Sequence, residues 1–409
     1  MRKTPFSAFR KYSFVAFLLA ILLGTEIGCK KQFNNPINAS SGEKTEELSR
    51  GASSDELKNF MQVNLVANNN LFGAAHIDPT LINAWGISFS PGGTFWVSSQ
   101  GGHVSGVYNR EGVTALGPVK IPSPGGPQGG NPTGQVFNPN AADFKIPSGN
   151  GTATAAARFI FVGVDGIVSG WNNTWGINSY AKFNNVATSA YTGLTLANNG
   201  GSNFLYAADF RARRIAVWDK DWNPVSMSFT DTHLPMGYSP FNIQVVGDQL
   251  YVMYAKVGPA GRSEDGVGKG IVNIFTTAGA FVKRFADKDK LNAPWGIALV
   301  PSSFFPKKME DEDDDDDDDD DDHARVAQPS VLVGNFGDGK INVYHPDGKF
   351  RGQLRMNNHT LVIERLWAIT LPPLTSTIDQ NRLYFAAGPR EEADGLFGYI
   401  IKDTTVRHD

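Results

Sequence analysis

Short runs in which apolar residues alternate with polar or small ones recur along this chain in a repeating order. Each repeat opens on a four-residue stretch such as Ala84-Trp85-Gly86-Ile87. Two more alternating runs follow, bounded by Gly, Asn or Asp, as is typical of β-strands joined by tight turns. The openings lie at 84–87, 132–135, 191–194, 240–243, 294–297 and 366–369. This pattern predicts one supersecondary unit repeated six times.

The later runs of the units also match. The second runs lie at 94–97, 159–162, 204–207, 249–252, 331–334 and 382–385, and the third at 104–108, 168–171, 215–218, 271–275, 341–344 and 396–400. Turns such as 345–348 then lead into a fourth run, which the last unit lacks. The alternating run 60–66 precedes the first unit, and we expect it to complete the last sheet and remove an exposed edge.

The sequence therefore predicts an all-β fold, a six-bladed β-propeller over residues 59–402 closed by an N-terminal strand in the last blade. An open sandwich or two small β domains are the alternatives. The 44 glycines and 23 prolines, with few apolar runs at helical spacing, also disfavour helices. A chain of 409 residues would ordinarily suggest two or three domains, but a propeller accommodates that length as one.

The net charge of −4 conceals an unbroken acidic run at 310–322, so the rest of the chain is basic. We expect this run to lie in a loop, 309–325, inserted between the first and second strands of blade five. Clustered carboxylates could bind calcium weakly. The alternative is a solvated, self-repelling loop, because the run has no spaced ligands that would fix a coordination geometry.

The N-terminus has the pattern of an export signal. Basic residues precede an apolar run at 14–23, and Gly28-Cys29 follows as in the cleavage region of a bacterial lipoprotein. Cys29 is the only cysteine, so we expect it to be acylated; Glu26 departs from the usual apolar residue, and simple cleavage leaving a free thiol is the alternative. We therefore divide the chain into a signal peptide (1–29), a disordered tether (30–58), the propeller and a tail (403–409).

This reading places the protein in the cell envelope, as a periplasmic or outer-membrane lipoprotein, or outside the cell, with the lipid anchor as its membrane contact. We expect a monomer. The basic and aromatic interleaving of nucleic-acid surfaces is missing, so we expect no nucleic-acid partner.

Loops that lead into the first strands and loops that join second to third strands should meet around the propeller axis, where ligands bind. The candidate ligand-binding residues at this mouth are His76, Asp78, Trp85, Asp165, Asp209, Arg211, Phe241, Asn242, Tyr254, Trp295, Asn335, Asp338, Glu364, Trp367 and Glu391. We call the second residue of each opening its marker. The aromatic markers Trp85, Phe241, Trp295 and Trp367 could stack on a planar or sugar-like ligand, or could pack blade against blade.

The sequence lacks the G-x-S-x-G and H-E-x-x-H motifs and any paired Cys/His spacing. Two functions stay open. The first is a binding module for a small molecule, a glycan or an envelope protein, which needs no cofactor. The second is a calcium-dependent hydrolase, lactonase or lyase, in which several blades each supply an oxygen ligand. The metal candidates for this second function are Asp165, Asp209, Asn335, Asp338 and Glu364.

Six motifs, at 76–87, 205–210, 239–244, 294–296, 332–339 and 395–398, together resemble an uncharacterised family of exported bacterial β-propeller proteins. The resemblance covers about residues 60–401, and the acidic insertion departs from the family pattern. More distantly, the units resemble NHL repeats and the SMP-30 lactonase superfamily. The resemblance implies a propeller fold and export, and it implies no activity.

Overall fold

The computed structural model describes residues 56–305, 328–373 and 377–403. The expected signal peptide with Cys29, the tether up to residue 55, the acidic loop 309–325 and the tail after residue 403 lie outside the described residues. Among the described residues, no helix has the length and apolar character needed to cross a membrane.

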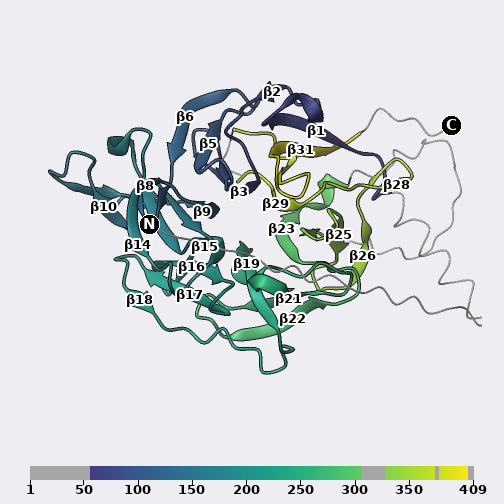
Figure 1. Ribbon diagram of the computed structural model, residues 1–409. Helices are drawn as coiled ribbons and strands as arrows, with labels where there is room; N and C mark the ends of the chain where they lie inside the picture. The colour runs from purple at the N-terminus through teal and green to yellow at the C-terminus, as the bar shows by residue number, and fades with distance from the viewer. Residues whose placement is uncertain (1–55, 306–327, 374–376, 404–409) are drawn as a thin grey trace, which may run out of the picture. The chain divides into compact units, whose positions relative to one another are not determined.

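The described residues form six sheets of four or five strands, placed one after another around an axis (Figure 1). The innermost strands of blades one to six are β3 (Ala84–Phe89), β9 (Pro132–Phe137), β15 (Tyr191–Asn199), β19 (Tyr238–Val246), β23 (Pro294–Val300) and β29 (Leu366–Thr370). Each innermost strand packs beside the next, and β29 packs beside β3, so the ring is closed at the axis. The prediction of an all-β, six-bladed propeller is confirmed.

In blades one to five the strands run antiparallel, and the chain moves outward from the first strand to the fourth. The second strands are β4 (Phe95–Ser99), β12 (Phe159–Gly163), β16 (Ser202–Asp209), β20 (Gln249–Lys256), β24 (Ser330–Asn335) and β30 (Leu383–Ala387). The third strands are β5 (Val104–Tyr108), β13 (Ile167–Trp171), β17 (Arg214–Asp219), β21 (Gly270–Phe275), β25 (Ile341–Tyr344) and β31 (Leu396–Lys402). The fourth strands of blades one to five are β6 (Thr114–Lys120), β14 (Tyr180–Asn184), β18 (Pro224–Val225), β22 (Phe281–Asp287) and β26 (Phe350–Gln353).

Blade six contains two strands from the beginning of the described chain. Strand β1 (Phe60–Ala67) pairs antiparallel with β31, from Phe60 opposite Lys402 to Ala67 opposite Leu396, with a β-bulge between Asn64 and Val66. Strand β2 (His76–Ile77) pairs parallel with the end of β1. The packed body extends slightly ahead of β1, because the side chain of Leu57 is buried and its carbonyl accepts a hydrogen bond from the Arg355 N–H.

Neighbouring innermost strands approach so closely that several of their positions require glycine, as two examples show. A Cβ on Gly86 would lie 2.4 Å from the carbonyl oxygen of Thr133, and a Cβ on Gly193 would lie 2.0 Å from Asn242 Oδ1. Asn242 occupies the position of Gly86 in its own blade, and its Nδ2 donates to the carbonyl of Trp295 in the next blade at 2.8 Å. The recurring glycine after the marker residue thus lets the strands meet at the axis.

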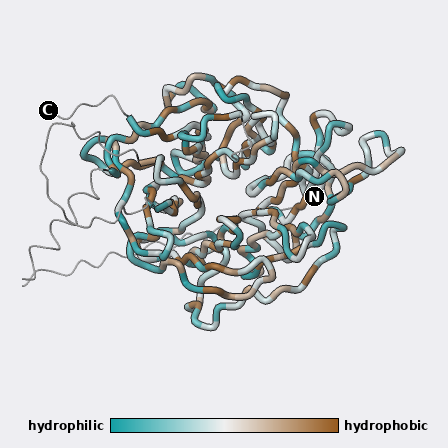
Figure 2. The backbone as a smooth tube through the Cα atoms, turned by 180° about the vertical axis from the view of Figure 1, so that it is seen from behind, coloured by the Kyte–Doolittle hydropathy of each residue, from teal (hydrophilic) through white to brown (hydrophobic). Residues whose placement is uncertain are grey.

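Hydrophobic side chains fill the spaces between neighbouring sheets, as the strand alternation predicts. In β17, for example, Ile215 and Val217 pack toward blade four with Val252, while Ala216 and Trp218 pack on the other face with Leu205. Figure 2 shows the hydrophobic stretches along the strands and hydrophilic stretches in the connecting loops. The second and third strands of a blade are therefore buried on both faces, and polar groups available for binding lie at the ends of the strands.

Short hairpins and 3-10 turns lie in the segments outside the main strands of the six blades. The two-stranded hairpins are β7 (Pro122–Ser123) with β8 (Gly126–Gly129), β10 (Lys145–Pro147) with β11 (Thr154–Ala156), and β27 (Arg355–Met356) with β28 (His359–Thr360). The 3-10 turns of the described residues are η1 (Asn70–Phe72), η2 (Asn173–Trp175), η3 (Pro259–Gly261) and η4 (Ser302–Phe304).

Candidate functional site

Aromatic rings from several blades fill the axis of the propeller. Trp85 stacks on Trp367 with 3.4 Å between ring centroids, and Phe336 stacks on the same indole at 3.9 Å. Trp295 and Phe241 meet Trp367 at 6.0 and 5.6 Å. All five side chains are at most 5% exposed. The aromatic residues of the openings therefore pack blade against blade and, with Phe336, form a buried floor beneath one end of the axis.

Polar contacts fix the orientation of two of these indoles. Trp367 Nε1 donates to Asn83 Oδ1 at 2.8 Å, and Trp295 Nε1 donates to the carbonyl of Thr192 at 2.9 Å. The Trp85 N–H is buried, and no residue that the structure describes accepts its hydrogen bond. The bond between Trp367 and Asn83 joins the aromatic floor to the polar groups above it.

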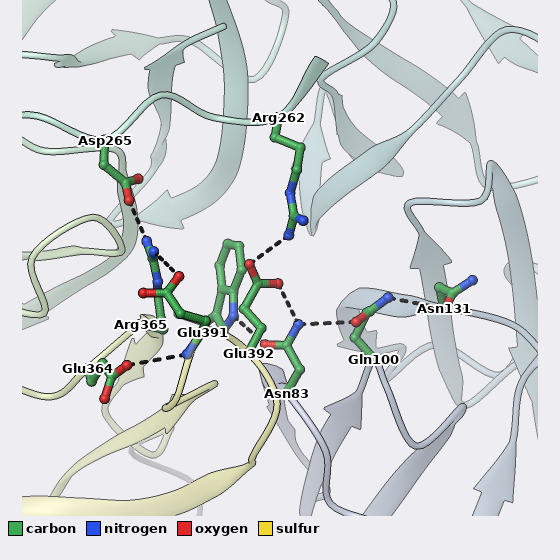
Figure 3. Close-up of polar contacts among 10 residues, drawn as sticks. Asn83, Gln100, Asn131, Arg262, Asp265, Glu364, Arg365, Glu391 and Glu392 are labelled. Carbon is green, nitrogen blue, oxygen red and sulfur yellow. Dashed lines mark hydrogen bonds and ion pairs between the residues drawn. The ribbon is translucent and has the colours of Figure 1, made fainter. Parts of the chain in front are cut away.

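Loops from blades one, two, four and six meet over this floor in one polar network, which we call the axial mouth (Figure 3). The axial mouth consists of Asn83, Gln100, Asn131, Arg262, Asp265, Glu364, Arg365, Glu391 and Glu392. The loops are the two classes that the sequence selected, those leading into first strands and those joining second to third strands.

Glu392 and Asn83 are the centre of the network. Arg262 Nη2 donates to Glu392 Oε1 at 2.8 Å, and Asn83 Nδ2 donates to Glu392 Oε2 at 2.9 Å and to Gln100 Oε1 at 3.1 Å. Gln100 Nε2 in turn donates to Asn131 Oδ1 at 3.1 Å. Figure 3 shows Glu392 between Arg262 and Asn83, with the amides of Gln100 and Asn131 continuing the chain of contacts. Side chains of four blades are thus linked by direct hydrogen bonds.

Arg365 forms the second half of the mouth. Its guanidinium donates to Asp265 Oδ2 and to Glu391 Oε2, both at 2.5 Å, and lies over the ring of Phe336 at 4.9 Å. The Glu391 N–H donates to Glu364 Oε1 at 3.3 Å. Because Asp265 belongs to the β20–β21 loop, this loop is tied to blade six by Arg365 as well as by the pair of Arg262 and Glu392.

The network shifts the titration of two of its charged groups. Burial raises the pKa of Glu392 above its ordinary value, and the nearby Arg262 and the Asn83 amide oppose that shift. Burial by itself would lower the pKa of Arg365, but hydrogen bonds to Asp265 and Glu391 outweigh it and raise the pKa. Four carboxylates face two guanidinium groups in the axial mouth, so it carries an excess of negative charge.

The backbone of blade six is constrained at the mouth. Arg390, Glu391 and Glu392 have φ angles of 56°, 57° and 70°, three consecutive non-glycine residues in the left-handed region. Arg365 and Asn83 also have positive φ, at 53° and 50°. Such conformations persist where the surrounding contacts determine them, and they are concentrated at functional sites. The carboxylates of the mouth are therefore held in place by the backbone as well as by their partners.

Three of the predicted metal candidates instead hold loops within their own blades. Each stands at or just after the end of a second strand and accepts a hydrogen bond from a backbone N–H ahead of the first strand. The pairs are Asp165 Oδ2 with Asn131 N at 2.9 Å, Asp209 Oδ1 with Ala190 N at 3.0 Å, and Asn335 Oδ1 with Asn292 N at 3.1 Å. This repeated contact ties the loop that leads into the first strand to the end of the second strand of the same blade.

The other candidates lie apart from the network. Asp78 accepts from the Tyr108 hydroxyl at 2.7 Å, Asp338 accepts from Asn335 Nδ2 at 3.0 Å, and Arg211 donates to the carbonyl of Val186 at 2.8 Å. His76 lies in β2 of blade six, and Tyr254 is buried at the end of β20. Of the fifteen candidates, the structure brings Glu364 and Glu391 together at the mouth, with Trp85, Phe241, Trp295 and Trp367 in its floor. No three His, Cys, Asp or Glu side chains gather in a metal-binding group within the described residues.

The sequence-based candidates did not include Asn83, Gln100, Asn131, Arg262, Asp265 and Arg365. Three of these stand two residues before the marker of their own blade, Asn83 before Trp85, Asn131 before Thr133 and Arg365 before Trp367. Comparing the polar residues just ahead of each marker would have found Asn83, Asn131 and Arg365. Nothing in the repeat marks Arg262, because the β20–β21 loop has no counterpart of its length in the other blades.

Two concave regions lie away from the mouth. A cavity of about 450 Å³ is lined by the far ends of innermost strands, with Ile87, Val136 and Leu196 among its residues. A larger cavity of about 720 Å³ lies between the outer part of blade three and blade four and includes Arg214 and Tyr254.

Two relatives share most of this chain. Uncharacterized protein L690 of Acanthamoeba polyphaga mimivirus is 31% identical over 355 residues, which are 84% of this chain and 86% of the relative. Uncharacterized protein R648 of the same virus is 30% identical over 358 residues, covering 84% and 81%. The chain belongs to the family of these two proteins. No family model matches it.

Among solved structures, this family member is similar to a streptogramin B lyase, with a TM-score of 0.45 and 14% identity over 84% of this chain and 98% of the lyase. It is also similar to nidogen in a complex with laminin, with a TM-score of 0.44 and 11% identity over 72% of this chain and 85% of that chain.

Proposed function

We propose that this chain is a binding module of the cell envelope, attached to a membrane through acylated Cys29, and that the axial mouth is its binding surface. The observation that carries the proposal is the polar network of four blades fixed over a buried aromatic floor. Within it the side chains of Glu391 and Arg262 are still 79% and 74% exposed. The resemblance to exported bacterial propellers supports the export step.

A preformed array of this kind suits binding. Hydrogen bonds and ion pairs already hold the side chains, so a partner loses little free energy in ordering them. The excess of carboxylates favours a partner that presents a cationic group, and it would raise the rate of encounter at low salt. We infer a small molecule, glycan or envelope protein with such a group as the ligand.

Site-specific photo-crosslinking in intact cells tests the binding surface. A photoreactive residue at the exposed position Ala393, beside the network, should form adducts of defined mass, whereas one at exposed Phe281 on the outer strand of blade four should form none. Neutralising two mouth carboxylates with Glu364→Gln and Glu391→Gln should lower the adduct yield several-fold, because it removes the excess negative charge.

The matched control for charge is Glu111→Gln, which neutralises an exposed carboxylate on a turn of blade one and should leave the yield unchanged. Equal adducts at positions 393 and 281, or a yield that the double neutralisation does not change, would show that the mouth is not the binding surface.

The lipid anchor is tested separately. We expect the wild-type chain in the membrane fraction after a high-salt wash, and Cys29→Ser in the soluble fraction, since acylation requires the thiol. Asn38→Ser in the tether serves as the control and should stay with the membrane. If Cys29→Ser also remained in the membrane fraction, another element would have to hold the protein there.

A further inference from the structure

Blade three has the shortest fourth strand of the propeller as described. Strand β18 pairs with β17 at two positions, Val217 opposite Val225 and Trp218 opposite Pro224. In blade four, by contrast, β22 accompanies β21 from Ile271 to Phe275. The first half of β17, Arg214 to Ala216, therefore has no strand on its outer side in the part of the chain that the structure describes. The chain after Val225 turns away from β17 toward blade four.

The hydrogen-bond pattern shows which backbone groups face this open edge. The Asp219 N–H donates to the carbonyl of Asn223 across the turn, so it points away from β16. Backbone groups along a strand repeat every two residues, and β17 pairs with β16 without a bulge from Asp219 to Arg214. The N–H and C=O of Ile215 consequently point to the outer side, where β18 does not reach.

A cavity adjoins this edge. Its volume is about 720 Å³, and β17 residues 214–218 form one wall while Met227, Phe229, Leu234 and Tyr254 are part of the other. Apolar groups from the blade three and blade four interface line it beside hydroxyl groups such as that of Thr230. The cavity thus occupies the place that a longer fourth strand would fill.

Positively charged side chains line one end of the cavity. Arg213 and Arg214 line it at the start of β17, and the Arg214 side chain is 64% exposed. The buried Asp209 lies behind, with its Oδ2 3.9 Å from Arg214 Nε and without a hydrogen-bond partner in the described chain. Asp231 on the opposite wall is already paired with Arg284. The end near Arg213 therefore keeps a positive charge that faces solvent.

We propose that blade three binds an extended peptide of a partner protein as an added strand along Arg214–Ala216, with an acidic residue of the peptide beside Arg213 and Arg214. Strand addition satisfies the open N–H and C=O of Ile215, and alternate side chains of the peptide enter the cavity, where apolar and hydroxyl groups are both available. The site is separate from the axial mouth and does not depend on the function proposed for the mouth.

Hydrogen exchange of the purified full-length chain tests the open edge directly. The Ile215 amide should exchange rapidly in the free protein, whereas the amide of Val272, its counterpart in blade four with Ala286 opposite it in β22, should be protected. An Ile215 amide as well protected as Val272 would mean that the edge is already paired, and the proposal would be wrong.

A peptide ligand can be selected by binding a phage-displayed library of random heptapeptides to the purified full-length chain. Enriched peptides should alternate β-branched or aromatic residues with others and carry an acidic residue at one end, and the synthetic peptide should protect the Ile215 amide. Arg213→Glu with Arg214→Glu should weaken its affinity about tenfold. The control Arg110→Glu reverses an exposed charge on blade one and should have no effect. A library that yields no such peptide, or peptides whose affinity the double charge reversal leaves unchanged, would overturn the proposal.

Discussion

Replacing Trp367 with alanine is expected to lower the free energy of unfolding by about 3–5 kcal/mol, the range for removing a buried tryptophan. The indole is 2% exposed and contacts Trp85, Phe336, Trp295 and Phe241 at the axis. Its removal leaves a cavity where several blades meet and also deprives Asn83 Oδ1 of its donor. Equilibrium unfolding in urea measures the change.

Trp367→Phe separates packing from hydrogen bonding. Phenylalanine retains most of the ring contacts but leaves Asn83 Oδ1 without the indole N–H, so we expect a smaller loss of about 1–3 kcal/mol. We also expect it to release the Asn83 side chain and so weaken the contact with Glu392. If alanine and phenylalanine destabilised the protein equally, the ring packing at the axis would contribute little, and the floor of the mouth would have to be described differently.

The fold could be predicted because each blade repeats the same local sequence pattern. A first strand must approach its neighbours at the axis, so Gly86 and Gly193 recur after the marker residue, and the second and third strands are rich in apolar residues because both of their faces are buried. These are local patterns within about fifty residues, and they add up over six units. Asn242, which stands where other blades have glycine, occupies the same position of its repeat.

The axial mouth could be predicted only in part, because its contacts join residues that are distant in the sequence. Arg262 and Glu392 are 130 residues apart, and Arg365 and Asp265 are 100 apart. The sequence placed Glu391 and Glu364 in the correct class of loop. It could not show that Asp165, Asp209 and Asn335 use their side-chain oxygens on their own backbone, because an oxygen that holds a loop and one that faces a ligand have the same residue type and position.

The same limitation applies to the open edge of blade three. The short β18 begins at Pro224, which cannot donate to a neighbouring strand, although apolar and polar residues continue to alternate after Val225 through Met227 and Phe229. The sequence pattern therefore does not show where the pairing with β17 ends. That point depends on the path of the chain toward blade four, which tertiary packing of Met227, Phe229 and Leu234 decides.

Phe60→Ala should have an effect as large as that of Trp367→Ala, a loss of about 3–5 kcal/mol, if β1 is an integral strand of blade six. The Phe60 ring is fully buried, stacks on Phe304 at 5.5 Å and meets Phe305 at 6.0 Å. It therefore joins a strand from the start of the described chain to the segment that follows the first strand of blade five. Urea unfolding with tryptophan fluorescence measures the loss.

Met61→Ala is the matched control, because Met61 is the next residue of β1, is 39% exposed and pairs with Ile401 along the strand. We expect it to change stability by no more than about 0.5 kcal/mol. A small effect of both variants would mean that β1 separates from β31 at little cost. The closure of the ring would then rest on the contact between β29 and β3 at the axis, and the loops that lead from β1 to Asn83 would lose their support.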